Sequence, residues 1–221
     1  MYKKDLYSSN KEHRKMKINI PPDLNPEEIK CFNEIVKPQL EELHSCTYDK
    51  FEFGNAKIFI SKDKFPDDTK SPDIEEIKNI LNKIPEKHLE FVSDIYFVSY
   101  HCKDDNHKTI KGRTLPIIYK IIIYPKVREK INNVLIHEIG HVLFDKLLNL
   151  RQKTEISQIA FMASISALSY TKIERYKFVQ EYFAGAYEDF LNEKKLVSKN
   201  PFFTHFINIF FTCHFTNKTS L

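Results

Sequence analysis

The chain has 221 residues, of which 42% are hydrophobic and 29% charged, and its formal net charge is +4. This length and composition are typical of a globular protein that can bury a core, and no apolar run is long enough to span a membrane. Because the positive excess is small and no block of Lys and Arg residues occurs, the sequence gives no indication of nucleic-acid binding.

The first 20 residues are polar and charged, and we expect them to form a loosely docked extension to a single domain at residues 21–221. This extension lacks the apolar segment of a secretory signal. Unless a signal has been removed, a cytoplasmic location is therefore the alternative to export.

Helical and strand-like patterns alternate along the first half of the domain. Pro26 suits the first turn of a helix, and Ser71 followed by Pro72 suits the N-cap and first position of another. Runs of β-branched and aromatic residues predict the strands. In chain order we expect helices at about 26–44, 71–84 and 85–92, and strands at 57–61, 94–100 and 115–124.

The second half of the domain is expected to be helical. A polar loop is expected at 101–114, and the four glycines of the chain leave few sites for tight hairpin turns. Mixed helices and strands followed by a helical half indicate an α+β domain with a cleft between its two halves. The later helices are expected at about 128–150, 155–168, 173–193 and 202–213.

The four cysteines are scattered and form no Cys-x-x-Cys pair, so the sequence predicts neither a cysteine zinc site nor a thioredoxin motif. In the absence of an export signal we expect free thiols, and two disulfides are the alternative. The cysteines are Cys31, Cys46, Cys102 and Cys213.

Residues 137–141 read His-Glu-Ile-Gly-His, an HExxH motif inside an apolar helical pattern. His137 and His141 lie about one turn apart on one helix face, so both rings can bind one zinc ion. Glu138 can take a proton from zinc-bound water and pass it to a leaving amine. Polar side chains in so apolar a helix need partners, which a metal ion supplies; the alternative is a pair of core histidines bonded to carboxylates.

Gly140 lies in the interior of this helix, where glycine costs roughly 1 kcal/mol relative to alanine. Close approach of another backbone is the usual reason for such a residue. Gly185, between Ala184 and Ala186, lies in the helix predicted at 173–193. We therefore expect these two helices to pack closely, although a helix crossing far from the metal would also fit.

The third zinc ligand should be a downstream His, Asp or Glu. If Gly185 marks the close approach, Glu181 lies one turn earlier on the same side of its helix. An exposed helical carboxylate is the other interpretation of Glu181. The candidate ligands are Glu155, Glu174, Glu181, Glu188, Asp189 and His205.

The HEIGH motif and the segment EYFAGAY that begins at Glu181 together resemble the catalytic domain of anthrax lethal factor and the Pro-Pro endopeptidases. In that family a helix beginning Glu-Phe-Phe-Ala-Glu-Ala-Phe follows the HExxH helix, and its first Glu is the third zinc ligand. Glu181 stands in that place, and residues 200–207 are similar to the family's closing helix. The resemblance covers roughly residues 85–213 and implies a zincin fold, one zinc ion per chain and a secreted peptidase.

The family has a tyrosine seven residues before the ligand glutamate, which helps to stabilise the oxyanion of the transition state. This chain has Glu174 at that position, with Tyr170 one turn earlier and Tyr176 nearer to Glu181. An inserted helical turn would leave Tyr170 beside the metal, so we expect Tyr170 to be the catalytic donor. Tyr176 is the alternative, and both could instead be packing residues.

Three further polar residues have weaker assignments. Asp145 follows His141 by one turn, and it is either a hydrogen-bond partner of a ligand histidine or an exposed carboxylate. His101 and His107 lie in the polar loop and are expected to be surface residues rather than ligands.

The sequence thus predicts a monomeric zinc metalloendopeptidase of the zincin type, with His137, His141 and Glu181 as metal ligands and Glu138 as general base. A protein or peptide substrate would bind in extended form along an edge strand. A second interpretation is a non-catalytic binding protein that retains the fold. The intact HExxH motif argues against it. Another is an intracellular regulator that cleaves a single partner.

Overall fold

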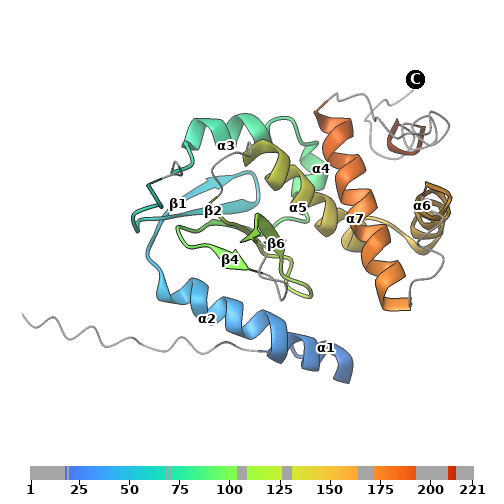
Figure 1. Ribbon diagram of the computed structural model, residues 1–221, viewed down its shortest axis with the longest axis horizontal. Coiled ribbons are helices and arrows are strands. Elements are labelled where there is room, and N and C mark those ends of the chain that lie inside the picture. Colours follow the sequence, from blue (N-terminus) through green and yellow to red (C-terminus); the bar gives the residue numbers. More distant parts are fainter. Residues whose placement is uncertain are drawn as a thin grey trace, which may run out of the picture. The chain divides into compact units, whose positions relative to one another are not determined.

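The computed structural model describes residues 18, 20–67, 69, 71–103, 109–125, 131–163, 172–192 and 209–212. The chain divides into two compact units, Met1–Thr47 and Tyr48–Leu221. Its helices and strands make it a mixed α+β protein (Figure 1). Most of the extension expected at residues 1–20 lies outside the described residues.

The first unit contains one helical segment in three consecutive parts. Asn25 caps this segment: its side chain accepts from the backbone N–H of Glu28, whose carboxylate accepts from the backbone N–H of Asn25. The helix expected at 26–44 is thereby confirmed, with a π-helical turn in its middle. The three parts are α1 (Pro26–Cys31), η1 (Phe32–Val36) and α2 (Lys37–Ser45).

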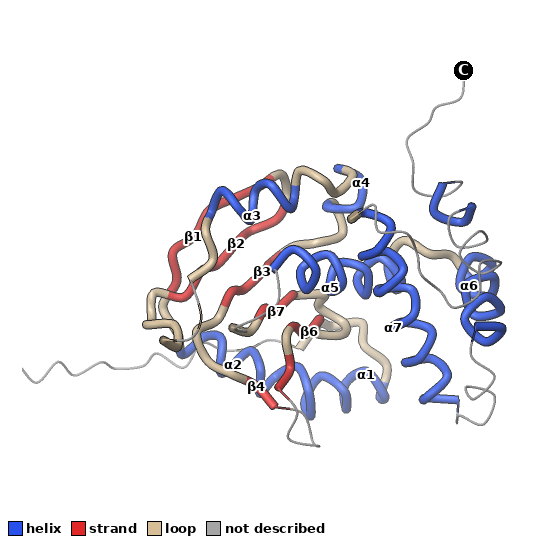
Figure 2. The backbone as a smooth tube through the Cα atoms, turned by 45° about the horizontal axis from the view of Figure 1, so that its top comes forward, coloured by secondary structure: helices blue, strands red, loops and turns tan. Residues whose placement is uncertain are grey.

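The second unit contains a five-stranded mixed sheet with the strand order β1-β2-β3-β7-β6 (Figure 2). The pairs β2–β3 and β3–β7 are parallel, whereas β1–β2 and β6–β7 are antiparallel. A separate ribbon pairs β4 with β5. The strands are β1 (Tyr48–Phe53), β2 (Ala56–Ser61), β3 (Asp94–Phe97), β4 (Cys102–Lys103), β5 (Thr109–Ile110), β6 (Gly112–Thr114) and β7 (Ile121–Ile123).

The scarcity of glycine predicts few tight turns, yet β1 and β2 form a hairpin with such a turn. Gly54 is sufficient for this one, because it adopts a φ of +56° in the two-residue loop that joins Phe53 to Ala56. The strand expected at 57–61 is confirmed as β2, but its partner β1 is missing from the prediction.

The strand expected at 115–124 is wrong in its first half, since β7 comprises only Ile121–Ile123. Pro116 has no N–H to donate to a neighbouring strand. Ile117 adopts a φ of +72°, and the amide of Ile118 donates to the carbonyl oxygen of Pro116 at 2.8 Å. Residues 116–118 therefore form a tight three-residue turn that returns the chain from β6 to β7.

Other boundaries differ from expectation for local reasons. Asp73, rather than Ser71, caps α3 (Ile74–Leu81), because its side chain accepts from the amide of Glu75. Pro72 accordingly precedes the cap.

The segment 101–114, expected to be a loop, contains β4, β5 and β6 among its described residues. The helix expected at 85–92 is the shorter α4 (Glu86–Leu89), and the strand expected at 94–100 ends at Phe97.

The helical second half is confirmed by α5 (Ile131–Lys146), α6 (Leu150–Ala163) and α7 (Lys172–Leu191). Most of the helix expected at 202–213 lies outside the described residues. The part that is described, 209–212, is helical. α3 and α5 lie on one face of the sheet, and α7 packs beside α5 (Figures 1 and 2).

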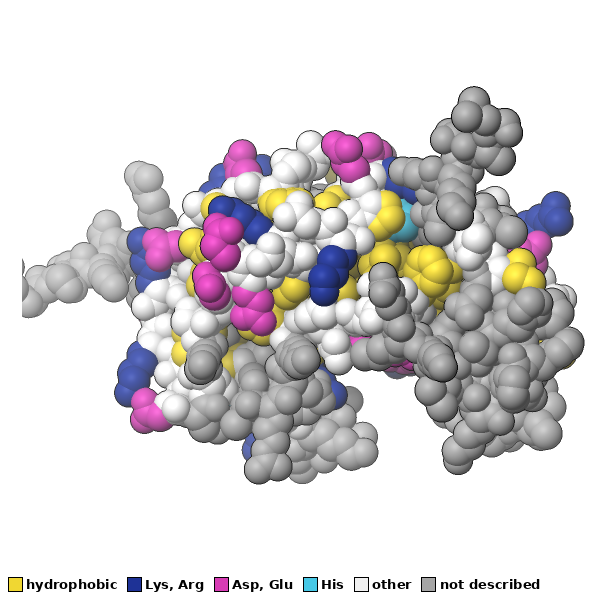
Figure 3. All heavy atoms as spheres, turned by 90° about the horizontal axis from the view of Figure 1, so that it is seen from above, with side chains coloured by type: hydrophobic (Ala, Val, Ile, Leu, Met, Phe, Trp, Pro, Cys, Tyr) yellow, Lys and Arg dark blue, Asp and Glu magenta, His cyan; other side chains and the backbone are white. Residues whose placement is uncertain are grey.

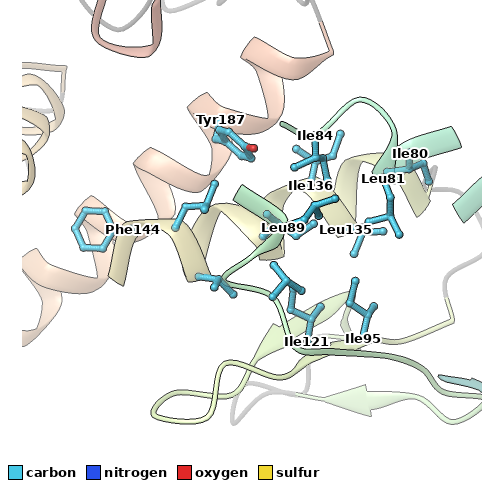
Figure 4. Close-up of a cluster of buried hydrophobic side chains, with 14 of the residues drawn as sticks. Ile80, Leu81, Ile84, Leu89, Ile95, Ile121, Leu135, Ile136, Phe144 and Tyr187 are labelled. Carbon is cyan, nitrogen blue, oxygen red and sulfur yellow. The ribbon is translucent and has the colours of Figure 1, made fainter. Parts of the chain in front are cut away.

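A single apolar cluster connects the sheet to the helices of the second unit (Figure 4). Ile95 and Ile121 from the sheet point toward Leu135 and Ile136 of α5. At one border of the cluster, Nδ1 of the buried His88 lies 2.8 Å from the hydroxyl of the buried Tyr187, which ties α4 to α7. The HExxH helix is thus held between the sheet and α7.

The surface has a mixed character. Acidic and basic side chains are interspersed on the face seen in Figure 3. No helix in the described part of the chain is both long and apolar enough to cross a membrane. Cys31, Cys46 and Cys102 carry free thiols, and Cys213 lies outside the described residues.

Helices α5 and α7 approach each other closely at Gly140 and Ala184. A Cβ added to Gly140 would lie 2.8 Å from the Cα of Ala184, so only glycine fits there. The close packing expected of these helices is confirmed, but Gly185 does not make it, since a Cβ there would meet no atom of the described residues within 4 Å. Ala184 follows Glu181 by almost one turn, so the contact brings the Glu181 face of α7 toward α5.

Gly140→Ala is expected to lower the free energy of unfolding by about 1–3 kcal/mol, because the added methyl group forces the two helices apart. Gly185→Ala is the matched control: it meets no neighbouring atom, and alanine is favoured over glycine in a helix by roughly 1 kcal/mol. Urea unfolding of both variants compares them directly. Equal stabilities would contradict the assignment of the contact to Gly140.

Candidate metal centre

Three side chains from α5 and α7 converge in the second unit. His137, His141 and Glu181 each offer one ligand atom, and these atoms lie within 4.8 Å of one another, so the group could hold a metal ion. The two histidines are partly buried and Glu181 is exposed, which leaves one side of the group open to solvent. Among the described residues no second group of this kind is found.

The two histidines face the same carboxylate. Nε2 of His137 lies 3.3 Å from Oε2 of Glu181, and Nε2 of His141 lies 3.5 Å from Oε1. The two imidazole rings are close to perpendicular, with their centroids 4.9 Å apart. The spacing of four residues places the rings one above the other on α5, and the contact at Gly140 brings α7 near enough for Glu181 to reach both.

The electrostatics of His141 and Glu181 favour metal binding, whereas His137 must release a proton before its ring can bind a metal. Burial opposes a charge on His137, but the hydrogen bond to Glu181 and the nearby carboxylates outweigh burial and raise its pKa. Burial dominates at His141 and lowers its pKa. The hydrogen bond with His137 lowers the pKa of Glu181. Near neutral pH the group therefore offers an ionised carboxylate and a neutral His141 imidazole, the forms that bind metals.

Glu138 lies beside the ligand group but is buried against the sheet. Its Oε2 accepts a hydrogen bond from the hydroxyl of Thr114 on β6 at 2.8 Å. Burial raises the pKa of Glu138 to about 7, so its carboxyl group can both hold and release a proton near neutral pH. Thr114 is a residue that the sequence analysis missed, because it falls in the segment expected to be a loop.

Glu188 approaches the other side of His137. Its Oε2 lies 3.8 Å from Nδ1 of His137, the ring nitrogen that does not face Glu181. A carboxylate at this nitrogen orients a metal-binding imidazole and raises its basicity. The sequence offers Glu188 only as a possible ligand, whereas in the structure its carboxylate lies near the ring nitrogen of His137 that faces away from Glu181.

Glu188→Ala is expected to weaken metal affinity by about 10–100-fold, because His137 would lose the carboxylate that orients its ring. Isothermal titration of the metal-free protein with zinc measures this. Glu155→Ala is the control: Glu155 accepts from Nε of Arg151 at 3.0 Å on α6 and should have no effect. If Glu188→Ala binds zinc as tightly as wild type, Glu188 has no part in the site.

Asp145 takes neither of its two expected roles. Its Oδ1 accepts from the hydroxyl of Tyr176 at 2.7 Å and from Nε2 of Gln180 at 3.1 Å. Asp145 therefore joins the end of α5 to α7. Burial and the bond to Asp145 raise the pKa of Tyr176, so its hydroxyl remains protonated and donates to Asp145.

Of the remaining candidates, those that the structure describes are not members of the group. Tyr170, His107 and His205 lie outside the described residues, and nothing is described of the Glu174 side chain. His101 is exposed, and Asp189 is partly buried on α7.

No protein-family model matches the chain, and no curated protein matches it. What the chain can do therefore follows from the geometry and chemistry of these side chains. They combine two imidazoles and a carboxylate with an adjacent buried acid, Glu138.

Proposed function

We propose that the chain is a zinc metallopeptidase in which His137, His141 and Glu181 bind one zinc ion. Zinc binds imidazole nitrogen and carboxylate oxygen at about 2.0–2.2 Å in tetrahedral geometry, so its ligand atoms are roughly 3.3–3.5 Å apart. The two distances from Glu181 oxygens to the Nε2 atoms, 3.3 and 3.5 Å, match this spacing. The proposal depends on this match and on the grouping of the three ligand atoms within 4.8 Å of one another.

Three protein ligands leave a fourth position open, as in catalytic zinc sites. Bound zinc supplies an acidified water and polarises the carbonyl group of the scissile peptide bond. Glu138 accepts the proton of the attacking water at its carboxylate and then donates it to the leaving nitrogen.

The free edge of β6 is suited to an extended peptide. The amide of Leu115 donates to Lys120, and the amide of Tyr124 donates to Lys111, each at 2.8 Å. Because hydrogen-bonded residues alternate along an antiparallel strand, the backbone groups of Gly112 and Thr114 point away from β7. β6 is the last strand of the sheet in the described part of the chain, so a substrate can pair with these groups.

The resemblance to the lethal factor and Pro-Pro endopeptidase family supports the same function and a zincin fold. Glu181 stands in the place of the family's third ligand. The mixed sheet followed by a helical half is compatible with that fold. The family's secreted peptidases also suggest that the substrate is a protein or peptide outside the cell, and we propose that the enzyme acts as a monomer.

Tyr170→Phe is expected to lower kcat by about 10²–10³-fold with little change in KM, because a phenol that stabilises the oxyanion acts mainly in the transition state. Tyr176→Phe should be nearly silent, since its hydroxyl already donates to Asp145 at 2.7 Å. Steady-state kinetics on any cleaved peptide measure both variants. If kcat fell in Tyr176→Phe and stayed normal in Tyr170→Phe, Tyr176 would be the oxyanion donor.

The function itself can be tested by incubating the zinc-loaded protein with a peptide library and identifying products by mass spectrometry. We expect internal peptide bonds to be cleaved, cleavage to stop when a chelator removes the metal, and zinc to restore it. Tight zinc binding without any cleavage would instead favour a non-catalytic zinc-binding protein.

A further inference from the structure

Strand β6 contacts the side chain of Glu138 at two alternate residues. Oγ1 of Thr114 lies 2.8 Å from Oε2 of Glu138 and 3.0 Å from its main-chain carbonyl oxygen. A Cβ added to Gly112 would lie 2.7 Å from Oε1 and 2.8 Å from Cγ of Glu138. The carboxylate therefore lies between the hydroxyl of Thr114 and the bare Cα of Gly112.

These two contacts restrict the carboxylate in different ways. A threonine hydroxyl has one proton to donate, and a charged acceptor forms the stronger hydrogen bond, so Oε2 is preferred over the carbonyl oxygen. Gly112 is not needed for its backbone conformation, since Gly54 is the glycine with positive φ in the described residues. The absence of a side chain at Gly112 therefore makes room for Glu138, and also for Val134, whose Cγ1 would lie 2.9 Å from an added Cβ.

We propose that Thr114 is a positioning residue for the general base, and that Gly112 provides the space in which the Glu138 carboxylate is held. This inference rests on the proposed function, because it takes Glu138 as the group that moves the proton. The backbone groups of the same two residues point to the free edge of β6. The strand that pairs with the substrate thus also orients the base, which aligns the carboxylate with the scissile bond.

Thr114→Val removes the hydroxyl and retains the branched shape, and it should lower kcat by roughly 100-fold, as expected for a displaced catalytic group. KM and zinc affinity should stay unchanged, because the ligands and the backbone of β6 are untouched. Thr114→Ser should restore kcat to within a few-fold of wild type. Gly112→Ala should lower kcat with the hydroxyl intact, and Thr109→Val, on the exposed β5, is the matched control.

A second measurement is independent of activity. If Thr114 donates to the Glu138 carboxylate, Thr114→Val and Glu138→Ala should have non-additive effects on the free energy of urea unfolding of the zinc-free protein. This cycle can be measured even if no peptide is hydrolysed, so that failure of the proposed function is distinguished from failure of the inference.

Three results would overturn the inference. The first is a kcat of Thr114→Val within about twofold of an active wild type. The second is a Thr114→Val variant that loses zinc affinity to the same extent as kcat, since Thr114 would then shape the metal site rather than the base. The third is strict additivity in the unfolding cycle.

Discussion

Glu138→Gln is expected to abolish measurable peptide hydrolysis while zinc remains bound. General acid–base catalysis contributes about 10²–10⁴-fold to rate, and an amide can neither accept the proton of water nor return it to the leaving nitrogen. Zinc binding should persist because Glu138 is not a member of the ligand group. The fold should persist because the amide oxygen can still accept from Thr114, as Oε2 does at 2.8 Å.

The comparison requires three measurements on the same preparation: kcat on a cleaved peptide, zinc stoichiometry and the urea midpoint. Glu155→Gln, which changes the partly buried carboxylate paired with Arg151 on α6, serves as the control and should behave as wild type. A Glu138→Gln variant that retains full activity would require another base. Loss of zinc in the variant would mean that Glu138 is itself a ligand.

Glu181→Ala is expected to lose zinc affinity by more than about 100-fold, because loss of a residue that only orients a ligand already costs about 10–100-fold. Activity should fall with the metal. The zinc-free variant should fold normally, since Glu181 is exposed and its removal leaves the Gly140–Ala184 contact intact. Titration with zinc measures the affinity, and thermal unfolding of the metal-free variant checks the fold.

The neighbouring Glu188 provides the internal comparison. Its carboxylate lies 3.8 Å from the Nδ1 atom of His137, so Glu188→Ala should weaken zinc binding less than Glu181→Ala does. If Glu188→Ala weakened zinc binding more than Glu181→Ala does, Glu188 would be the ligand and Glu181 the residue that orients His137. Wild-type zinc affinity in Glu181→Ala would place the third ligand elsewhere in the chain.

Local patterns were sufficient to predict that His137, His141 and Glu181 come together in a group that could hold a metal ion. The spacing of four between His137 and His141 already places both rings on one helix face. Gly140 predicted the close approach of a second helix, because an interior glycine needs such a reason. Yet the partner of Gly140 is Ala184 rather than Gly185, since a sequence indicates that a small residue is present without showing which side of the helix it faces.

The residues that support the site could not be predicted in the same way. Thr114 and Glu138 are 24 positions apart, and their hydrogen bond depends on β6 lying at the edge of the sheet beside α5. β6 itself is three residues long, too short to show an alternating pattern. The turn at 116–118 likewise depends on a positive φ at Ile117, which a β-branched residue rarely adopts and local propensity opposes.

Anomalous diffraction at the zinc absorption edge, recorded from crystals of the zinc-loaded protein, tests the central claim most directly. The predicted result is one strong peak per chain, about 2.0–2.2 Å from Nε2 of His137, Nε2 of His141 and a carboxylate oxygen of Glu181, with a fourth position open to solvent. A peak at other residues, or no peak in zinc-saturated crystals, would contradict it.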